Sequence, residues 1–202
     1  MATHNSTIKS SDINLKIVSF NVRGLRNSKK RRTLFHSFKK KAFDVICLQE
    51  TYLLKKDSHI IEKEWGHNYH LAEGTNHSKG LLTLFGKNFQ DINFSLLKES
   101  DRCLISLISF EDLNITLLNV YAPCNNNEKH GFLNNIMKNV SDLNNDQYSN
   151  IVVLGDFNMV LDNKLDIISG EYHDENIVKK FNSLKNIFSD TLEVCCPKIS
   201  RF

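Results

Sequence analysis

Short apolar and alternating runs recur along the chain and predict strands. The segment from Asn14 to Phe20 alternates and is rich in β-branched residues, as in a strand with one buried face. The runs at 44–48 and 150–154 are almost continuously apolar, which predicts strands that are buried on both faces. Further strands are expected at 80–86, 92–97, 103–110 and 114–121. Because only residues 111–113 separate the last two, we expect them to form an antiparallel hairpin.

Apolar residues at spacings of three and four predict helices between these strands. One helix is expected over 28–41 with Ser28 as its N-cap, and another over 175–188. A third is expected over 128–143, and the mixed segment around Trp65 is expected to be partly helical.

Strands and helices thus alternate, which excludes an all-helical and an all-β fold. Apolar strands need cover on both faces, so we expect a mixed α/β (α+β) domain: two packed sheets with helices outside. Residues 1–13 are polar and are expected to form a flexible arm, and residues 14–202 a single domain.

Composition narrows the class of protein without identifying it. The chain has 202 residues, of which 41% are hydrophobic and 24% charged, as in globular proteins. Its net charge of +3 is too small to indicate a nucleic-acid binder by itself. No apolar run approaches the roughly 18 residues of a membrane helix, and the start lacks the apolar stretch of a secretory signal. The five cysteines form no Cys-x-x-Cys pair, which indicates a reducing, intracellular compartment.

Polar side chains follow four of the predicted strands, at the point where each strand ends. They are Asn21, Gln49 with Glu50, Asn119 with Tyr121, and Asp156 with Asn158. Taken singly, a carboxylate or amide at such a place is more often a turn former or a helix cap. If the strands share a sheet edge, however, Asn21, Glu50, Asp156 and Asn158 converge in one cleft.

Such a cleft would offer oxygen ligands and no cysteine or histidine pair at metal-binding spacing. Oxygen-only ligation favours Mg²⁺, with Mn²⁺ as the alternative, over Zn²⁺. A magnesium site beside a second carboxylate suits phosphodiester hydrolysis, since the carboxylate can orient or deprotonate water. Amide and phenol groups could donate hydrogen bonds to phosphate oxygens.

Four motifs in order carry a family resemblance: Ser19 to Leu25 (SFNVRGL), Leu48 to Thr51 (LQET), Asn119 to Pro123 (NVYAP) and Gly155 to Asn158 (GDFN). The chain resembles the exonuclease–endonuclease–phosphatase superfamily with its deoxyribonuclease-I-like fold. More narrowly, it resembles the apurinic-type endonuclease domain of LINE-type retrotransposons, and the extension from Met159 to Asp166 favours that branch. The resemblance covers residues 14 to about 195.

The resemblance implies a Mg²⁺-dependent endonuclease that nicks target DNA for retrotransposition. Carried over by motif, Asn21 and Glu50 would hold the metal, together with Asp156 and Asn158. Tyr121 would contact the scissile phosphate, and Asp156 would orient or deprotonate the attacking water. Asn158 would help to orient the catalytic site and bind phosphate, with Asn119 as a further contact to DNA. Many relatives have asparagine where this chain has Cys124, and Asn125 is the expected substitute.

The family pattern continues with an Arg-x-Asp element and a Ser-Asp-His motif, and neither appears in residues 193–202. The resemblance therefore implies that the last strands and one catalytic group are missing, so weak or no activity is expected of this chain. The partners implied are DNA and a reverse transcriptase downstream, with no membrane and no obligate protein partner, in the nucleus or in cytoplasmic transit. The alternatives are an inactive gene fragment, an abasic-site repair endonuclease or exonuclease, and a phosphatase acting on phosphoinositides.

Two basic runs, 29–32 and 39–41, flank the first predicted helix. They could contact a phosphate backbone, and the first could act as an import signal. A solvated helix face is the simpler interpretation, and we favour it.

Overall fold

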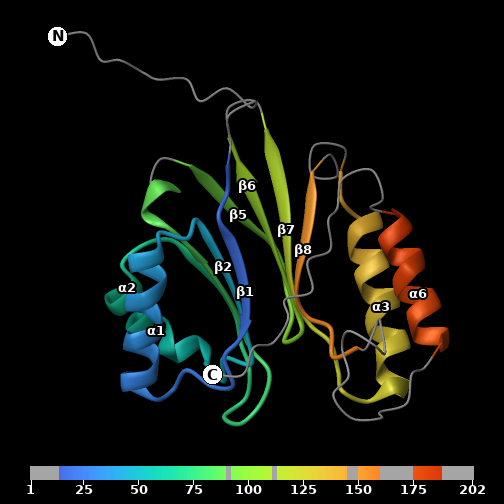
Figure 1. Ribbon diagram of the computed structural model, residues 1–202, viewed down its shortest axis with the longest axis horizontal. Helices are drawn as coiled ribbons and strands as arrows, with labels where there is room; N and C mark the ends of the chain where they lie inside the picture. Colours follow the sequence, from blue (N-terminus) through green and yellow to red (C-terminus); the bar gives the residue numbers. More distant parts are fainter. Residues whose placement is uncertain (1–13, 90–91, 111–112, 145–149, 160–174, 188–202) are drawn as a thin grey trace, which may run out of the picture.

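The computed structural model describes residues 14–89, 92–110, 113–144, 150–159 and 175–187. The predicted arm at 1–13 and the segment 188–202 lie outside these residues. The described elements form four layers, with two sheets face to face and helices on both outer sides (Figure 1). The predicted two-sheet sandwich with flanking helices is confirmed.

Each sheet has four strands, and each contains one parallel pair. The first has the order β1 (Ile17–Asn21), β2 (Val45–Gln49), β4 (Leu81–Phe85), β3 (Tyr69–Ala72), with β1 parallel to β2. The second has the order β5 (Asn93–Glu99), β6 (Cys103–Ser109), β7 (Asn114–Tyr121), β8 (Ile151–Asp156), with β7 parallel to β8. Strands β6 and β7 form the predicted antiparallel hairpin.

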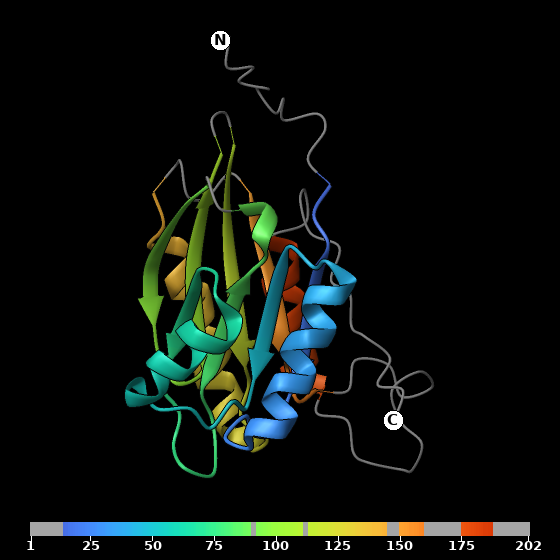
Figure 2. The ribbon, with the colours of Figure 1, turned by 90° about the vertical axis from the view of Figure 1, so that its left-hand side faces the viewer.

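The helices cover the outer faces of the sheets. Figure 2 shows α1 (Ser28–Lys41) and α2 (Ser58–Trp65) in front of the first sheet. Helices α3 (Asn126–Ser141) and α6 (Glu175–Ile187) cover the second sheet. Single 3₁₀ turns occupy Lys55–Asp57 and Lys87–Phe89. In the described part of the chain, no helix has the length and apolar character that crossing a membrane requires.

The structure corrects the expected ends of two helices and adds one strand. The N-cap of α1 is Asn27 rather than Ser28, because the Asn27 side chain accepts a hydrogen bond from the Lys30 N–H. Helix α3 begins two residues earlier than expected, where Asn125 caps it by accepting from the Asn127 N–H. Strand β3 was not predicted, because four residues of mixed polarity give too short a pattern.

Alternate residues of the central strands belong to different apolar cores of the protein. In β2, Ile46 and Leu48 pack toward α1 and α2, whereas Val45 and Cys47 pack toward the other sheet. In β7, Leu118 and Val120 pack toward α3 and α6, whereas Leu117 faces the interior of the sandwich. The strands are therefore buried on both faces, as their continuous apolar runs predict.

The basic runs are only partly a solvated helix face. Lys29, Arg32 and 39–41 are exposed, but Arg31 is 4% exposed, and for this residue the favoured interpretation is wrong. Its guanidinium forms a two-pronged ion pair with Glu64 of α2, at 2.7 Å and 2.9 Å, and also donates to the Leu25 carbonyl. The pair ties α1 to α2 and to the loop that leads into α1.

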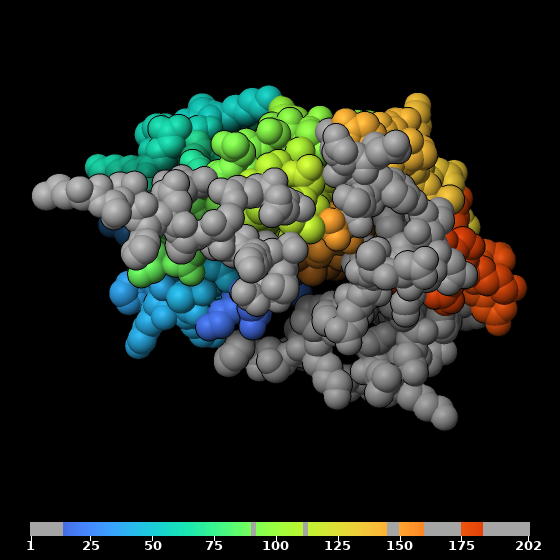
Figure 3. Space-filling view, turned by 90° about the horizontal axis from the view of Figure 1, so that it is seen from above, coloured from blue at the N-terminus to red at the C-terminus, as the bar shows by residue number. Residues whose placement is uncertain are grey.

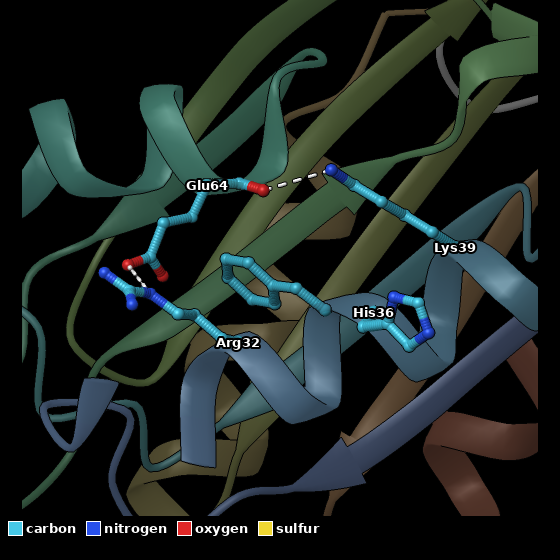
Figure 4. Close-up of a pocket in the computed structure, with 5 residues that line it drawn as sticks. Arg32, His36, Lys39 and Glu64 are labelled. Carbon is cyan, nitrogen blue, oxygen red and sulfur yellow. Dashed lines mark hydrogen bonds and ion pairs between the residues drawn. The ribbon is translucent and has the colours of Figure 1, made fainter. Parts of the chain in front are cut away.

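A pocket of about 290 Å³ opens beside this ion pair, between α1 and α2 (Figure 4). Arg32 donates to the Glu64 carboxylate at 3.1 Å, and Lys39 donates to the Glu64 carbonyl at 3.0 Å. The Lys39 ammonium also lies 5.3 Å from the centre of the Trp65 ring. These cations are thus engaged in holding two helices together.

We expect Glu64→Gln to lower the free energy of unfolding by about 3 kcal/mol near neutral pH, because it leaves the buried Arg31 charge unpaired. Hydrogen bonds from Arg31, opposed by burial and aided by Arg32, hold the pKa of Glu64 below its usual value. This stabilisation is therefore present above the unfolded-state pKa of about 4.3 and is lost as the pH falls through the lower folded-state pKa. Urea unfolding at pH 7 and pH 3 measures both effects.

The matched control is Glu62→Gln on the same helix, where the carboxylate is exposed. We expect it to change stability by no more than about 0.5 kcal/mol. Equal losses for the two variants, or a Glu64→Gln loss that does not shrink at pH 3, would contradict the assignment.

Candidate active site

The four strands that carry the predicted site residues end at one end of the sandwich. Strands β1 and β2 run parallel in one sheet, and β7 and β8 run parallel in the other. All four run downward in Figure 1, so the loops that follow them gather at the lower end. Figure 3 views the molecule from the other end, where these strands begin. The expected convergence is therefore a consequence of strand direction in both sheets.

A bridging amide joins two carboxylates across the sheets. The Asn21 Nδ2 group donates to Glu50 Oε1 at 2.8 Å and to Asp156 Oδ2 at 2.7 Å. Asn21 ends β1 and Glu50 follows β2 in the first sheet, and Asp156 ends β8 of the second. The predicted meeting of these three residues is confirmed, although their chemical roles stay predictions.

The fourth predicted residue, Asn158, lies beside Asp156 and fixes it. The Asn158 backbone N–H donates to Asp156 Oδ1 at 3.0 Å, so both oxygens of Asp156 have a partner. The Asn158 side chain donates to the Ala122 carbonyl at 2.7 Å, and the Ala122 N–H donates to the Asp156 carbonyl at 2.8 Å. These bonds lock the loop after β8 to the segment after β7.

Gly155 allows β8 to pack against the Val120 carbonyl of β7. Its φ is +152°, a conformation that favours glycine, and a Cβ added there would lie 1.9 Å from the Val120 carbonyl oxygen. The residue before the catalytic candidate Asp156 is thus a glycine for a steric reason.

Glu50 accepts hydrogen bonds from two side chains. Besides Asn21, the Tyr52 hydroxyl donates to Oε2 at 2.8 Å, and the Tyr121 hydroxyl lies near this carboxylate. Burial raises the pKa of Glu50, but Asn21, Tyr52, Tyr121 and the nearby Arg23 charge outweigh it and lower the pKa below its usual value. Glu50 is therefore charged at neutral pH.

Tyr121 is 9% exposed and stays protonated. Burial, and after it the nearby Glu50 carboxylate, raise the pKa of Tyr121 well above its usual value. The Arg102 guanidinium lies 5.3 Å from the centre of the Tyr121 ring. Tyr121 is thus a hydrogen-bond donor at the edge of the protein interior, with the Arg102 guanidinium against its ring.

Strained backbone concentrates at this end of the molecule. Among the described non-glycine residues with positive φ, Arg23 (46°), Glu50 (53°), Tyr52 (57°) and Asn158 (46°) all belong to the loops around the cluster. Such conformations cost about 1–3 kcal/mol each and collect at functional sites. The surrounding hydrogen bonds hold this cluster in place against that cost.

The expected phosphate contact by Asn119 is wrong. Its side chain is fully buried between the sheets, where it accepts from Gln49 Nε2 at 2.8 Å and donates to the Thr83 hydroxyl and to the Leu48 and Leu82 carbonyls. An amide satisfied in this way cannot face a ligand. Asn125, in contrast, is exposed at the start of α3, where its side chain caps the helix. Its contact with phosphate stays a prediction.

Two residues near the cluster were not predicted from the sequence. Tyr52 follows Glu50 by two residues, which was the available signal, but only the positive φ values bring its hydroxyl back onto the Glu50 carboxylate. Arg102 precedes β6 and lies far from every motif in the sequence. It reaches the cluster because the Tyr121 N–H donates to the Arg102 carbonyl.

The oxygen-rich cluster suits a hard divalent cation. Its candidate metal ligands are the Glu50 and Asp156 carboxylates and the Asn21 amide. The described residues contain no cluster of three His, Cys, Asp or Glu side chains placed to hold a metal. The two carboxylates share only a neutral amide, so the negative charge of the cluster favours a bound cation. The Asn21 oxygen accepts from the Arg23 N–H at 3.1 Å, so ligation through this oxygen requires the amide to turn over.

Similar proteins include a transposon protein and endonucleases. The chain is 25% identical over 179 residues to the transposon TX1 uncharacterized 149 kDa protein of Xenopus laevis, covering 88% of this chain and only 13% of that protein. The AP endonuclease LMAP from Leishmania major has a similar fold, with a TM-score of 0.69, 15% identity and coverage of 89% of this chain and 69% of that one. The endonuclease domain of TRAS1, a telomere-specific non-LTR retrotransposon, gives a TM-score of 0.60, 11% identity and coverage of 85% and 71%.

The family model for the endonuclease/exonuclease/phosphatase family matches residues 18–164, which include all four motifs and the whole hydrogen-bonded cluster. The fold, with its two mixed sheets and outer helices, is that of hydrolases of this family. The chain therefore belongs to the endonuclease/exonuclease/phosphatase family.

Proposed function

We propose that this chain is a metal-dependent DNA endonuclease domain that nicks target DNA for transposition. The observation that carries the proposal is the Asn21 amide held between Glu50 and Asp156 at the junction of the two sheets. The similarity to a transposon protein supports the choice of DNA as substrate within the family.

Each residue of the cluster has a defined task in phosphodiester hydrolysis. Glu50 and Asn21 would hold the cation, together with Asp156. When bound, Mg²⁺ supplies positive charge that polarises a phosphoryl oxygen and stabilises the leaving oxygen. Asp156 orients the attacking water and accepts its proton. Tyr121 and Asn158 donate hydrogen bonds to the charged phosphate oxygens.

Cations flank the acidic cluster and suit a polyanionic substrate. Arg23 is exposed on the loop after β1, close enough to lower the pKa of the Glu50 carboxylate. Arg102 lies against Tyr121 on the other side. A DNA backbone that crosses the cluster would meet positive charge on both sides, which offsets the repulsion between phosphate and carboxylate. The net charge of +3 is thus compatible with binding DNA.

The direct test is nicking of supercoiled plasmid with Mg²⁺, by this chain and by the longest natural protein that contains it. We expect metal-dependent conversion of supercoiled to open-circular DNA by the longer protein, abolished by EDTA. Absence of nicking by the longer protein would contradict the proposal.

The alternatives within the family are separated by substrate. An abasic duplex and a phosphoinositide, assayed beside plain duplex DNA, distinguish a repair endonuclease and a lipid phosphatase from the proposed enzyme.

We also propose that the domain acts in the nucleus, as part of a polyprotein that contains a reverse transcriptase.

A further inference from the structure

Tyr52 contacts the proposed metal-binding carboxylate from a place that no family motif assigns. Its hydroxyl donates to Glu50 Oε2 at 2.8 Å, while Asn21 Nδ2 donates to Oε1 at 2.8 Å. One oxygen of the carboxylate is therefore held from β1 and the other from the loop after β2. With both oxygens held, the plane of the carboxylate cannot rotate freely.

The Tyr52 ring is itself fixed on several sides. Its backbone has a φ of +57°, its N–H donates to the Lys79 carbonyl, and its carbonyl accepts from Arg26 Nε at 2.9 Å. The ring lies on Gly24, where an added Cβ would come within 2.8 Å of Tyr52 Cδ2. Gly24 thus leaves the space that the ring fills, and the strained backbone of Tyr52 directs its hydroxyl to Glu50.

The apolar core needs neither the Tyr52 ring nor the positive φ of its backbone. Tyr52 is half-buried and belongs to none of the described clusters of buried apolar residues. The backbone hydrogen bonds to Lys79 and Arg26 hold this positive φ in place, and the φ turns the hydroxyl to Glu50. Strained conformations of this kind collect at functional sites.

We infer that Tyr52 is a positioning residue, which orients the Glu50 carboxylate for cation binding through a hydrogen bond to Oε2. This inference rests on the proposed function for the role of Glu50, but the contact itself exists without metal or DNA. Groups that hydrogen-bond to a metal ligand and so orient it typically contribute about 10- to 100-fold in metal affinity or activity.

The first test needs neither metal nor substrate. NMR relaxation of the Glu50 side chain, assigned with Glu50→Gln, reports how freely the carboxylate moves in the metal-free protein. We expect an ordered carboxylate in the wild type and a mobile one in Tyr52→Phe, which removes only the hydroxyl. An equally ordered carboxylate in Tyr52→Phe would overturn the inference.

The matched control is Tyr69→Phe, which removes a hydroxyl that donates to the exposed Glu62 at 3.1 Å, away from the cluster. We expect this variant to leave the order of Glu50 unchanged. The same loss of order in both variants would overturn the inference, because the effect would then be a general one.

The second test is calorimetric titration with Mn²⁺. Tyr52→Phe should weaken binding by about 10- to 100-fold, while Tyr69→Phe binds as the wild type does. Wild-type affinity in Tyr52→Phe would overturn the inference. A wild type that binds no Mn²⁺ would instead contradict the proposed function, and the NMR result would then decide the positioning role by itself.

Discussion

Asp156→Asn is expected to lower the rate of Mg²⁺-dependent DNA nicking by about 10²- to 10⁴-fold, the range for loss of a positioned general base. The carboxylate accepts from Asn21 at Oδ2 and from the Asn158 N–H at Oδ1. An amide has the same shape but only one acceptor oxygen, so it can keep one of these bonds and cannot take a proton from water. Single-turnover nicking by the longest active protein measures the loss.

The fold should survive this substitution, with a cost of about 1 kcal/mol for the lost hydrogen bond. Asp142→Asn is the matched control, since Asp142 is exposed at the far end of α3 from the site. It should nick DNA at the wild-type rate. If Asp156→Asn did so too, Asp156 would have no part in the chemistry.

Gly155→Ala is expected to lower the free energy of unfolding by roughly 2–6 kcal/mol. The estimate adds about 1–3 kcal/mol for a backbone conformation that favours glycine and about 1–3 kcal/mol for overpacking. The new methyl group would lie 1.9 Å from the Val120 carbonyl oxygen, so β8 must move away from β7. Since Asp156 ends β8, the same movement would separate it from Asn21. Urea unfolding measures the stability loss.

Gly131→Ala is the control for the same chemical change. Gly131 is exposed in α3, and no atom lies within 4 Å of an added Cβ. Because alanine favours a helix over glycine by about 1 kcal/mol, this variant should be slightly more stable than the wild type. Equal effects at the two positions would contradict the close approach of β7 and β8.

The gathering of Asn21, Glu50 and Asp156 could be predicted because it depends on local pattern and strand direction. Each residue ends or directly follows a strand whose apolar run requires burial. The expected common sheet edge is wrong for Asp156, because β8 belongs to the other sheet, and the groups meet because the parallel strands of both sheets end at the same end of the sandwich. The roles that the resemblance assigns to them depend on motif matches rather than on geometry, and they await the nicking experiment.

For other residues, the local sequence pattern is insufficient to predict which groups surround the side chain. Asn119 and Tyr121 are two positions apart on β7 and so share a face, and the sequence does not distinguish them. Only the packing of the sheets places Asn119 among hydrogen-bond partners in the interior and leaves Tyr121 at its edge beside Glu50. Arg31 likewise belongs to a basic run, and only α2 supplies the carboxylate that lets it be buried.

The sequence by itself determined the described strands except β3, most of the helices, the two-sheet class and the polar groups at the strand ends, since these follow from periodicities of a few residues. Tertiary structure decided which of those groups touch. Asn21 and Asp156 are 135 residues apart, and their contact exists because two separate sheets pack face to face. It also decided the role of Tyr52, whose hydroxyl reaches Glu50 through a strained turn. Side-chain periodicity carries no information about such contacts, because they depend on the relative placement of elements that are remote in the chain.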